Sequence, residues 1–207
     1  MKKQLPYFFL VFLLPVIAVL WWWGLFSSAT LTVGTAGDYR YAYLDAQGVY
    51  SKLVKKQDEV LFELKKQNIT PGAEVALLMS DPRTTPSDDL MAQAGFMIGK
   101  DANPLPPLKV NTIHKREVVI AEIKAHPLLA YGKVYSALLE YAKQHNTGLH
   151  LPTLEMYEHS ILRVEMPLNE QNLTNQIAPD QLSPDQLPAA QSKSDATKTY
   201  TNESLKP

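Results

Sequence analysis

An uncharged run at the N-terminal end of the chain, LPYFFLVFLLPVIAVLWWWGLF over residues 5–26, is the feature that most restricts the fold. A helix of roughly 22 residues rises about 33 Å, which is enough to cross the hydrocarbon core of a bilayer. The tryptophans at 21–23 fall where interfacial aromatic residues are favoured, and Pro15 would kink such a helix. We therefore expect a transmembrane helix over 5–26, after a short flank at 1–4.

A cleaved secretory signal is the alternative, because Ser27, Ser28 and Ala29 are small enough for a cleavage site. The run is longer than a usual signal core and ends in tryptophans, which favours an uncleaved signal-anchor. Lys2 and Lys3 precede the run, and the first positive charge after it is Arg40. The positive-inside bias then leaves the N-terminus in the cytoplasm and places the domain across the inner membrane, in the periplasm of a bacterium.

Charge and composition exclude several classes of function. The chain has 20 Lys and Arg against 21 Asp and Glu, so no basic field attracts nucleic acid. It has no cysteine, which excludes thiol catalysis, disulfides and cysteine zinc sites. The histidines show no metal-ligand spacing along a helix, and phosphate-binding and nucleophile-elbow motifs are absent. We expect neither a metal nor another cofactor.

The same order of elements, strand–helix–strand–strand, occurs twice between residues 39 and 168. The pattern predicts strands at 39–46, 74–79, 90–98, 110–125, 154–158 and 161–166, and helices at 49–67 and 131–144. The sequence VYSKL at 49–53 is echoed by VYSAL at 134–138, where each helix is expected to open. Together these features predict an internally duplicated α+β domain, with two helices on one antiparallel sheet and a cleft between the halves.

Two polar segments flank this domain. Residues 27–38 (SSATLTVGTAGD) are small and polar, and we expect them to form a tether. Residues 169–207 are rich in Asn, Gln, Pro, Ser and Thr, and are predicted to be a disordered tail. Sparse apolar residues in the tail leave room for a weak docking motif, and hence for a protein partner.

Three motifs resemble those of the GyrI-like and SOUL haem-binding-like superfamily of small-molecule-binding domains. They are Gly48-Val49-Tyr50, the loop DPRTTPSD at 81–88, and LPTLEMYE at 151–158 followed by VEMPL at 164–168. Their order and spacing agree with the family over about residues 39–168. With the apolar N-terminal run, the chain looks most like the testis-expressed ER-phagy receptor group and its bacterial relatives. Val49 stands where the family motif Gly-Pro-Tyr has proline, and the second helix does not open with that motif.

The resemblance implies a GyrI-like fold, but it restricts function only loosely. Members of the superfamily include drug-sensing domains of transcription regulators, gyrase inhibitors, hydrolases of cyclopropane natural products, and receptors or scaffolds. It also implies that Glu155 is the acid that contacts the ligand.

Glu155 is also the first candidate from the residues themselves. On a strand it shares a face with Thr153 and Tyr157, and a carboxylate beside aromatic rings suits a cationic ligand. The further ligand-binding candidates are Tyr41, Tyr43, Tyr50, Tyr135 and Tyr157. Ordinary packing is the alternative for each tyrosine, and a structural hydrogen bond is the alternative for Glu155.

These observations predict a membrane-anchored module that captures a cationic or amphipathic small molecule. A scaffold that acts through its tail is the second hypothesis. A hydrolase that pairs Glu122 with Glu155 as acid and base is the third. The non-catalytic hypotheses are favoured.

Overall fold

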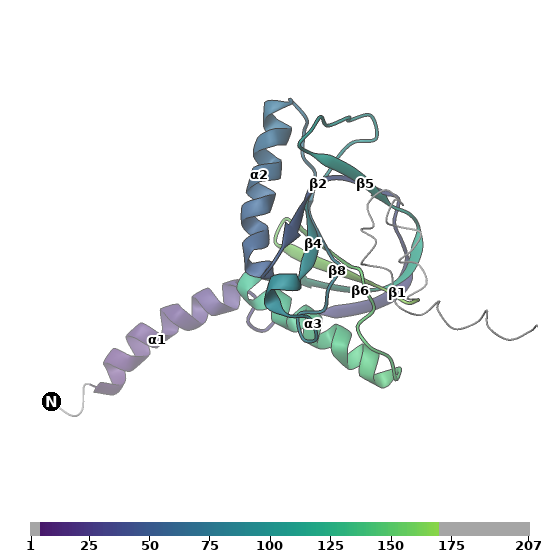
Figure 1. Ribbon diagram of the computed structural model, residues 1–207. Helices are drawn as coiled ribbons and strands as arrows, with labels where there is room; N and C mark the ends of the chain where they lie inside the picture. Colours follow the sequence, from purple (N-terminus) through teal and green to yellow (C-terminus); the bar gives the residue numbers. More distant parts are fainter. Residues whose placement is uncertain (1–4, 170–207) are drawn as a thin grey trace, which may run out of the picture. The chain divides into compact units, whose positions relative to one another are not determined.

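The computed structural model describes residues 5–169, with side chains from Phe9 onward. The chain divides into two units, Met1–Gln176 and Ile177–Pro207, and the described residues all belong to the first (Figure 1). The tail expected over 169–207 lies outside the described residues except for Asn169.

Helix α1 (Leu5–Trp22) is the first element, and it ends before the expected boundary at Phe26. Turns follow Trp22, and Gly24 adopts a positive φ of 85°, the left-handed conformation that commonly ends helices at glycine. Within residues 5–169 no helix has both the length and the apolar character needed to span a bilayer, so the transmembrane helix expected over 5–26 is not found.

The segment 27–38, which we expected to be a tether, contains strand β1 (Thr30–Ala36), so that prediction is wrong. β1 pairs antiparallel with β6 (Arg116–Lys124) along its whole length, from Thr30 with Glu122 to Ala36 with Arg116. Its threonines and valine are β-branched and favour strands. Composition suggested a linker because the pairing partner is far away in the sequence.

The duplicated order of elements is confirmed. Two 3₁₀ turns are added in the first half, at Tyr50–Lys52 before the helix and at Ser87–Asp89 before the third strand. In the second half, the expected strand 110–125 divides in two at a corner formed by His114 and Lys115. The first half consists of β2 (Tyr39–Gln47), α2 (Leu53–Lys66), β3 (Glu74–Leu78) and β4 (Met91–Met97). The second half consists of β5 (Lys109–Ile113), β6 (Arg116–Lys124), α3 (Pro127–Gln144), β7 (Thr153–Glu158) and β8 (Ile161–Pro167).

All strands belong to one antiparallel sheet with the order β1-β6-β8-β7-β3-β4-β2-β5. This order is symmetric about its centre, where β7 of the second half pairs with β3 of the first. Each strand therefore has a counterpart at the same distance from the centre: β8 matches β4, β6 matches β2, and β1 matches β5. This arrangement is what a duplicated domain with pseudo-twofold symmetry requires.

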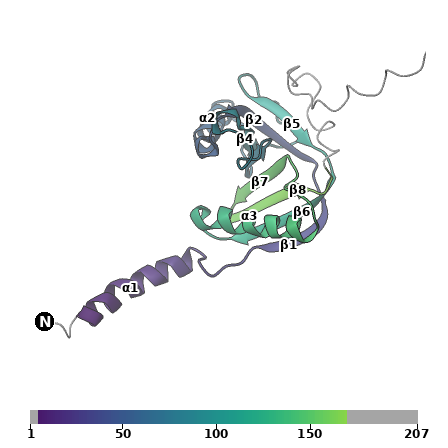
Figure 2. The same cartoon turned by 60° about the horizontal axis from the view of Figure 1, so that its bottom comes forward.

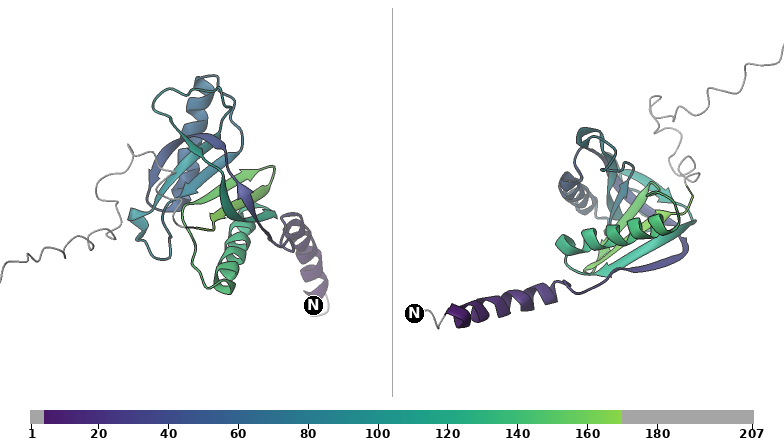
Figure 3. Two further views of the ribbon diagram at one scale, coloured as in Figure 1. Left: turned by 90° about the vertical axis from the view of Figure 1, so that its right-hand side faces the viewer. Right: turned by 90° about the horizontal axis from the view of Figure 1, so that it is seen from below.

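Both large helices cover the same face of the sheet, which we call the helix face. α2 packs on β2 and β4, while α3 packs on β6 and β8. The helices lie apart from each other over the two halves (Figures 2 and 3). α3 begins at Pro127, earlier than the expected Tyr131, because proline suits a first turn and His126 Nδ1 accepts a hydrogen bond from the Leu128 N–H at 3.4 Å.

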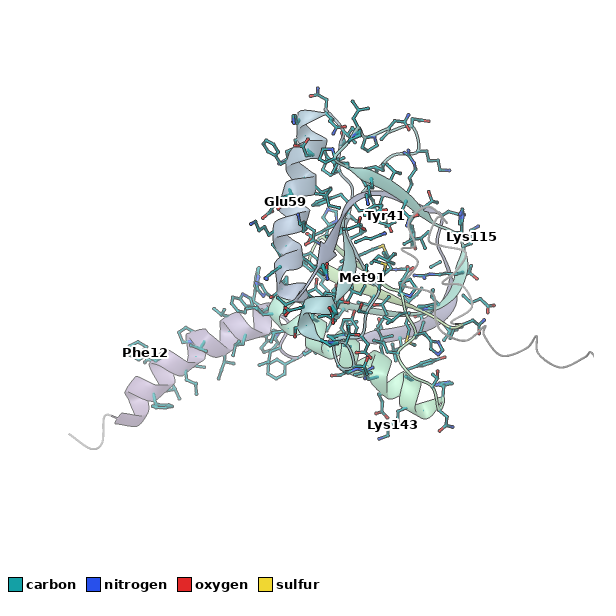
Figure 4. All side chains as sticks on the ribbon, viewed as in Figure 1. Phe12, Tyr41, Glu59, Met91, Lys115 and Lys143 are labelled. Carbon is teal, nitrogen blue, oxygen red and sulfur yellow. The ribbon has the colours of Figure 1, made fainter. Side chains whose placement is uncertain are left out.

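The two ends of the sheet are joined by continuous backbone. β1 runs through Gly37 into β2, β5 runs through His114 and Lys115 into β6, and these two long strands keep one register across the corner. Ala36 pairs with Arg116, and Tyr39, three residues later, pairs with Ile113, three residues before Arg116. The register therefore continues unbroken. The strands thus form a ring in Figure 1, with Lys115 at its corner in Figure 4. We call the face that points away from the helices the inner face.

Candidate functional site

Glu155 lies near the centre of the sheet, on β7, and faces the helices. Its cross-strand partners are Ala76 on β3 and Val164 on β8, and Val164 belongs to the apolar core beneath α3. Only 8% of the residue is exposed. The alternation of β7 therefore places one carboxyl group between the two halves of the domain, on the face covered by the helices.

A tyrosine from the second helix holds this carboxyl group. The Tyr135 hydroxyl donates a hydrogen bond of 2.5 Å to Glu155 Oε1. Burial, followed by the nearby charge of Glu155, raises the pKa of Tyr135 well above its usual value, so the phenol keeps its proton. The two side chains form a dyad from α3 and β7 in which the direction of the hydrogen bond is fixed.

The acidity of Glu155 is changed by its surroundings. Burial raises the pKa of this carboxyl group from 4.5 to about 7, and the Tyr135 hydrogen bond opposes the rise. Burial removes water from the ionised form, and one neutral donor replaces only part of that solvation. Near neutral pH the carboxyl group is therefore present in both protonation states.

The prediction that Tyr50 and Tyr135 open the two helices at matching positions is wrong, because Tyr50 lies in the 3₁₀ turn before α2 whereas Tyr135 lies in the middle of α3. The fold nevertheless brings them to one cluster. Both pack against the same buried apolar cluster, which includes Leu53 and Ala76. The Tyr50 hydroxyl donates to Ser80 O at 2.6 Å, and its pKa is raised mainly by burial, with a contribution from Glu155. Tyr50 therefore lies near Glu155, although its hydroxyl is hydrogen-bonded to the backbone of Ser80.

Tyr157 and Tyr131 complete the aromatic surroundings. Tyr157 shares the face of Glu155 and is the cross-strand partner of Glu74. Tyr131 lies one turn before Tyr135 on α3, and burial, Glu155, Glu74 and Tyr157 together raise its pKa. Neither Tyr131 nor Glu74 was among the predicted site residues, although Tyr131 precedes Tyr135 by four residues, a helical spacing that predicts a shared face.

Tyr41 and Tyr43 lie on the inner face, so the prediction that they line the same site as Glu155 is wrong. Ala42 between them packs toward α2 in the core beneath that helix. The Tyr41 hydroxyl donates to Gln93 Oε1 at 2.5 Å, and Tyr41 lies on the side of β2 away from α2 (Figure 4). Alternation correctly predicts that the two tyrosines share a face, but it does not say which face.

The acid–base pair of the hydrolase hypothesis does not form. Glu122 Oε2 lies 3.8 Å from Arg163 Nη1 on the inner face, whereas Glu155 lies on the helix face. Across residues 5–169, no group of three or more His, Asp or Glu side chains is placed to hold a metal ion.

Comparisons with known proteins bear on the fold. No family model matches the chain, and no curated protein matches it. The crystal structure of the EcmrR C-terminal domain aligns over 69% of this chain and 97% of that one, at 13% identity and a TM-score of 0.52. A cryo-EM structure of an EcmrR–DNA complex aligns over 80% of this chain and 67% of that one, at 12% identity and a TM-score of 0.51.

A structure of SAV2435 bound to tetraphenylphosphonium aligns over 68% of this chain and 96% of that one, at 11% identity. Its TM-score of 0.46 is too low to establish a common fold. The two EcmrR structures, at identities of 12% and 13%, show that the chain shares the α+β fold of the EcmrR C-terminal domain, in agreement with the GyrI-like fold that the motifs predict.

Proposed function

We propose that the chain is a GyrI-like small-molecule-binding protein whose ligand contacts Glu155 between the two halves of the domain. The motifs at 48–50, 81–88, 151–158 and 164–168 support this function, as does the fold. The observation that carries the proposal is the buried Glu155 carboxyl group, held by Tyr135 on the face that the helices cover.

The ligand that fits this site best is an amphipathic organic cation. A positive charge close to Glu155 would stabilise the ionised carboxylate, which burial otherwise disfavours. The phenol rings of Tyr131, Tyr135 and Tyr157 supply aromatic surface, and aromatic faces attract cations. We expect the ligand to enter where α2 and α3 lie apart, at the cleft that duplication predicts.

Binding of a lipophilic cation tests this proposal. The full-length chain is titrated calorimetrically with tetraphenylphosphonium and, as a neutral control of similar shape, with triphenylphosphine oxide. The cation is expected to bind more tightly, and Glu155→Gln is expected to weaken its binding at least about tenfold, or 1.4 kcal/mol. Glu117→Gln, at an exposed position on β6, is the matched control and should leave the affinity unchanged.

Two results would refute the assignment of Glu155. One is equal affinity of the wild type and Glu155→Gln for the cation. The other is equal affinity of the wild type for the cation and for the neutral oxide.

We also propose that the N-terminal segment holds the domain at the bacterial inner membrane, with the domain on the periplasmic side. The uncharged run at 5–26 and the preceding Lys2 and Lys3 support this location. So do the exposed apolar side chains of α1, including Phe9 and Phe12, each 71% exposed. Alkaline carbonate extraction and a topology reporter fused after Leu168 test the location. The proposed location would be overturned by recovery of the protein in the soluble fraction or by reporter activity confined to the cytoplasm. A mature N-terminus near Ala29 would overturn it as well, because the segment would then be a cleaved signal.

A further inference from the structure

A second polar cluster lies on the inner face of the sheet, opposite the Glu155 site. Its centre is Glu165 on β8, which is fully buried. Leu154 of β7 is the cross-strand partner of Glu165, whereas the next residue along β7, Glu155, points to the helix face. The two acids therefore lie on opposite faces of the sheet, and the second cluster is separate from the proposed ligand site.

The two oxygens of Glu165 have different surroundings. Oε1 accepts hydrogen bonds from the Tyr39 hydroxyl and from Arg163 Nε, each at 2.9 Å, and Arg163 Nη2 lies at the same distance. Oε2 is buried and has no hydrogen-bond partner among the described residues. Buried carboxylate oxygens are nearly always paired, so an unpaired one points to a ligand atom or a bound water.

The charges around Glu165 favour a neutral donor at Oε2. Arg163 contacts the carboxylate directly. The buried Arg116 is also close, because Glu165 raises its pKa against the larger lowering effect of burial. Glu122 Oε2, 3.8 Å from Arg163 Nη1, adds a second negative charge, so the two guanidinium groups and the two carboxylates carry no net charge together. The cluster therefore has no excess charge to hold an ion, whereas an uncharged O–H or N–H can pair with Oε2.

The surrounding wall is aromatic and apolar. The rings of Tyr41 and Tyr43 lie 5.5 Å apart, and Met97 and Met156 pack against the same inner-face cluster. Burial decreases from fully buried Glu165 toward Arg163, whose side chain is 32% exposed, and Met156 is partly exposed. Arg163 and Met156 therefore lie where the cluster meets solvent, and methionine walls adapt to ligands of different shape.

We propose that the inner face binds an uncharged aromatic compound that carries one hydrogen-bond donor, a phenol or an indole, and that this donor pairs with Glu165 Oε2. The site is independent of the proposed cation site at Glu155. It would give one domain two ligand sites of different chemistry on the two faces of its sheet.

The probes are 4-propylphenol and its methyl ether, 4-propylanisole, which keeps the ring and chain but lacks the donor. The full-length chain is labelled at its methionine methyl groups with ¹³C and titrated with each probe. The Met156 and Met97 signals are expected to shift saturably with the phenol, with at least tenfold weaker binding of the ether. Met166, which lies in the core beneath α3, is expected to stay in place.

Three variants separate the roles of the residues. Glu165→Gln places an amide where Oε2 accepts, and should weaken phenol binding at least tenfold. Glu117→Gln changes an exposed acid on β6 outside this cluster, and should retain binding. Glu155→Gln should have no effect on the phenol, so this test and that of the cation site can fail separately.

Absence of a saturable shift at Met156, or equal binding of phenol and ether, would overturn the proposal and assign Oε2 to a trapped water. Unchanged phenol affinity in a folded Glu165→Gln variant would overturn it as well. If that variant does not fold, the comparison of phenol and ether on the wild type decides.

Discussion

Replacing Glu155 with glutamine should change the stability of the protein in a pH-dependent way. The folded-state pKa of this acid is raised from 4.5 to about 7, so the folded protein binds more protons than the unfolded chain between those values. Stability of the wild type therefore falls as the pH rises through this window. Glutamine has a similar shape, still accepts the Tyr135 hydrogen bond and does not ionise, so the variant lacks this loss.

The size of the effect follows from the change in pKa. A rise from 4.5 to about 7 corresponds to about 3 kcal/mol, at about 1.4 kcal/mol per pKa unit. Below pH 4.5 both proteins carry a neutral side chain at position 155, and their free energies of unfolding should be similar. Above pH 7 Glu155→Gln should be more stable by about 3 kcal/mol, which for a chain of this size corresponds to about 6–12 °C in Tm.

Thermal and urea unfolding of the full-length chain between pH 4 and 8.5 measure this difference. Glu117→Gln changes an exposed acid on β6, and its difference from the wild type should not follow the same curve. The reasoning is refuted if the difference between Glu155→Gln and the wild type is constant over this range, or if the variant becomes less stable as the pH rises.

Three further predictions test the site and the fold. Affinity for tetraphenylphosphonium should rise about tenfold per pH unit below pH 7 and level off above it, because the cation prefers the ionised Glu155; calorimetry should show no such slope in Glu155→Gln. Gly37→Ala should destabilise the chain by about 2 kcal/mol or more in urea, because φ is 139° and an added Cβ would lie 2.4 Å from His114 O; Gly34→Ala on the same strand, with open space around it, should cost about 1 kcal/mol or less. Leu138→Ala, at a fully buried position of α3, should cost about 2–5 kcal/mol, whereas Leu128→Ala on the same helix, at 77% exposure, should change urea stability by about 0.5 kcal/mol or less.

Local periodicity was sufficient to predict much of the domain. Alternation along β7 put Thr153, Glu155 and Tyr157 on one face, and the helical spacing located α2 and most of α3. These features depend on side-chain directions that repeat every two or 3.6 residues, so a short window of sequence contains them.

Long-range pairing decided the rest. Nothing in residues 30–36 says that they pair with β6, so a small polar composition suggested a linker. Tyr41 and Tyr43 alternate with Ala42, but only the packing of α2 on Ala42 puts the tyrosines on the inner face. The same closure of the sheet buries Glu165 among residues of β2 and β6, and its place depends on contacts between segments more than a hundred residues apart. Residues close together in the chain determine which side chains of a strand share a face. Elements far apart in the chain determine, by packing on the sheet, which of its faces the helices cover.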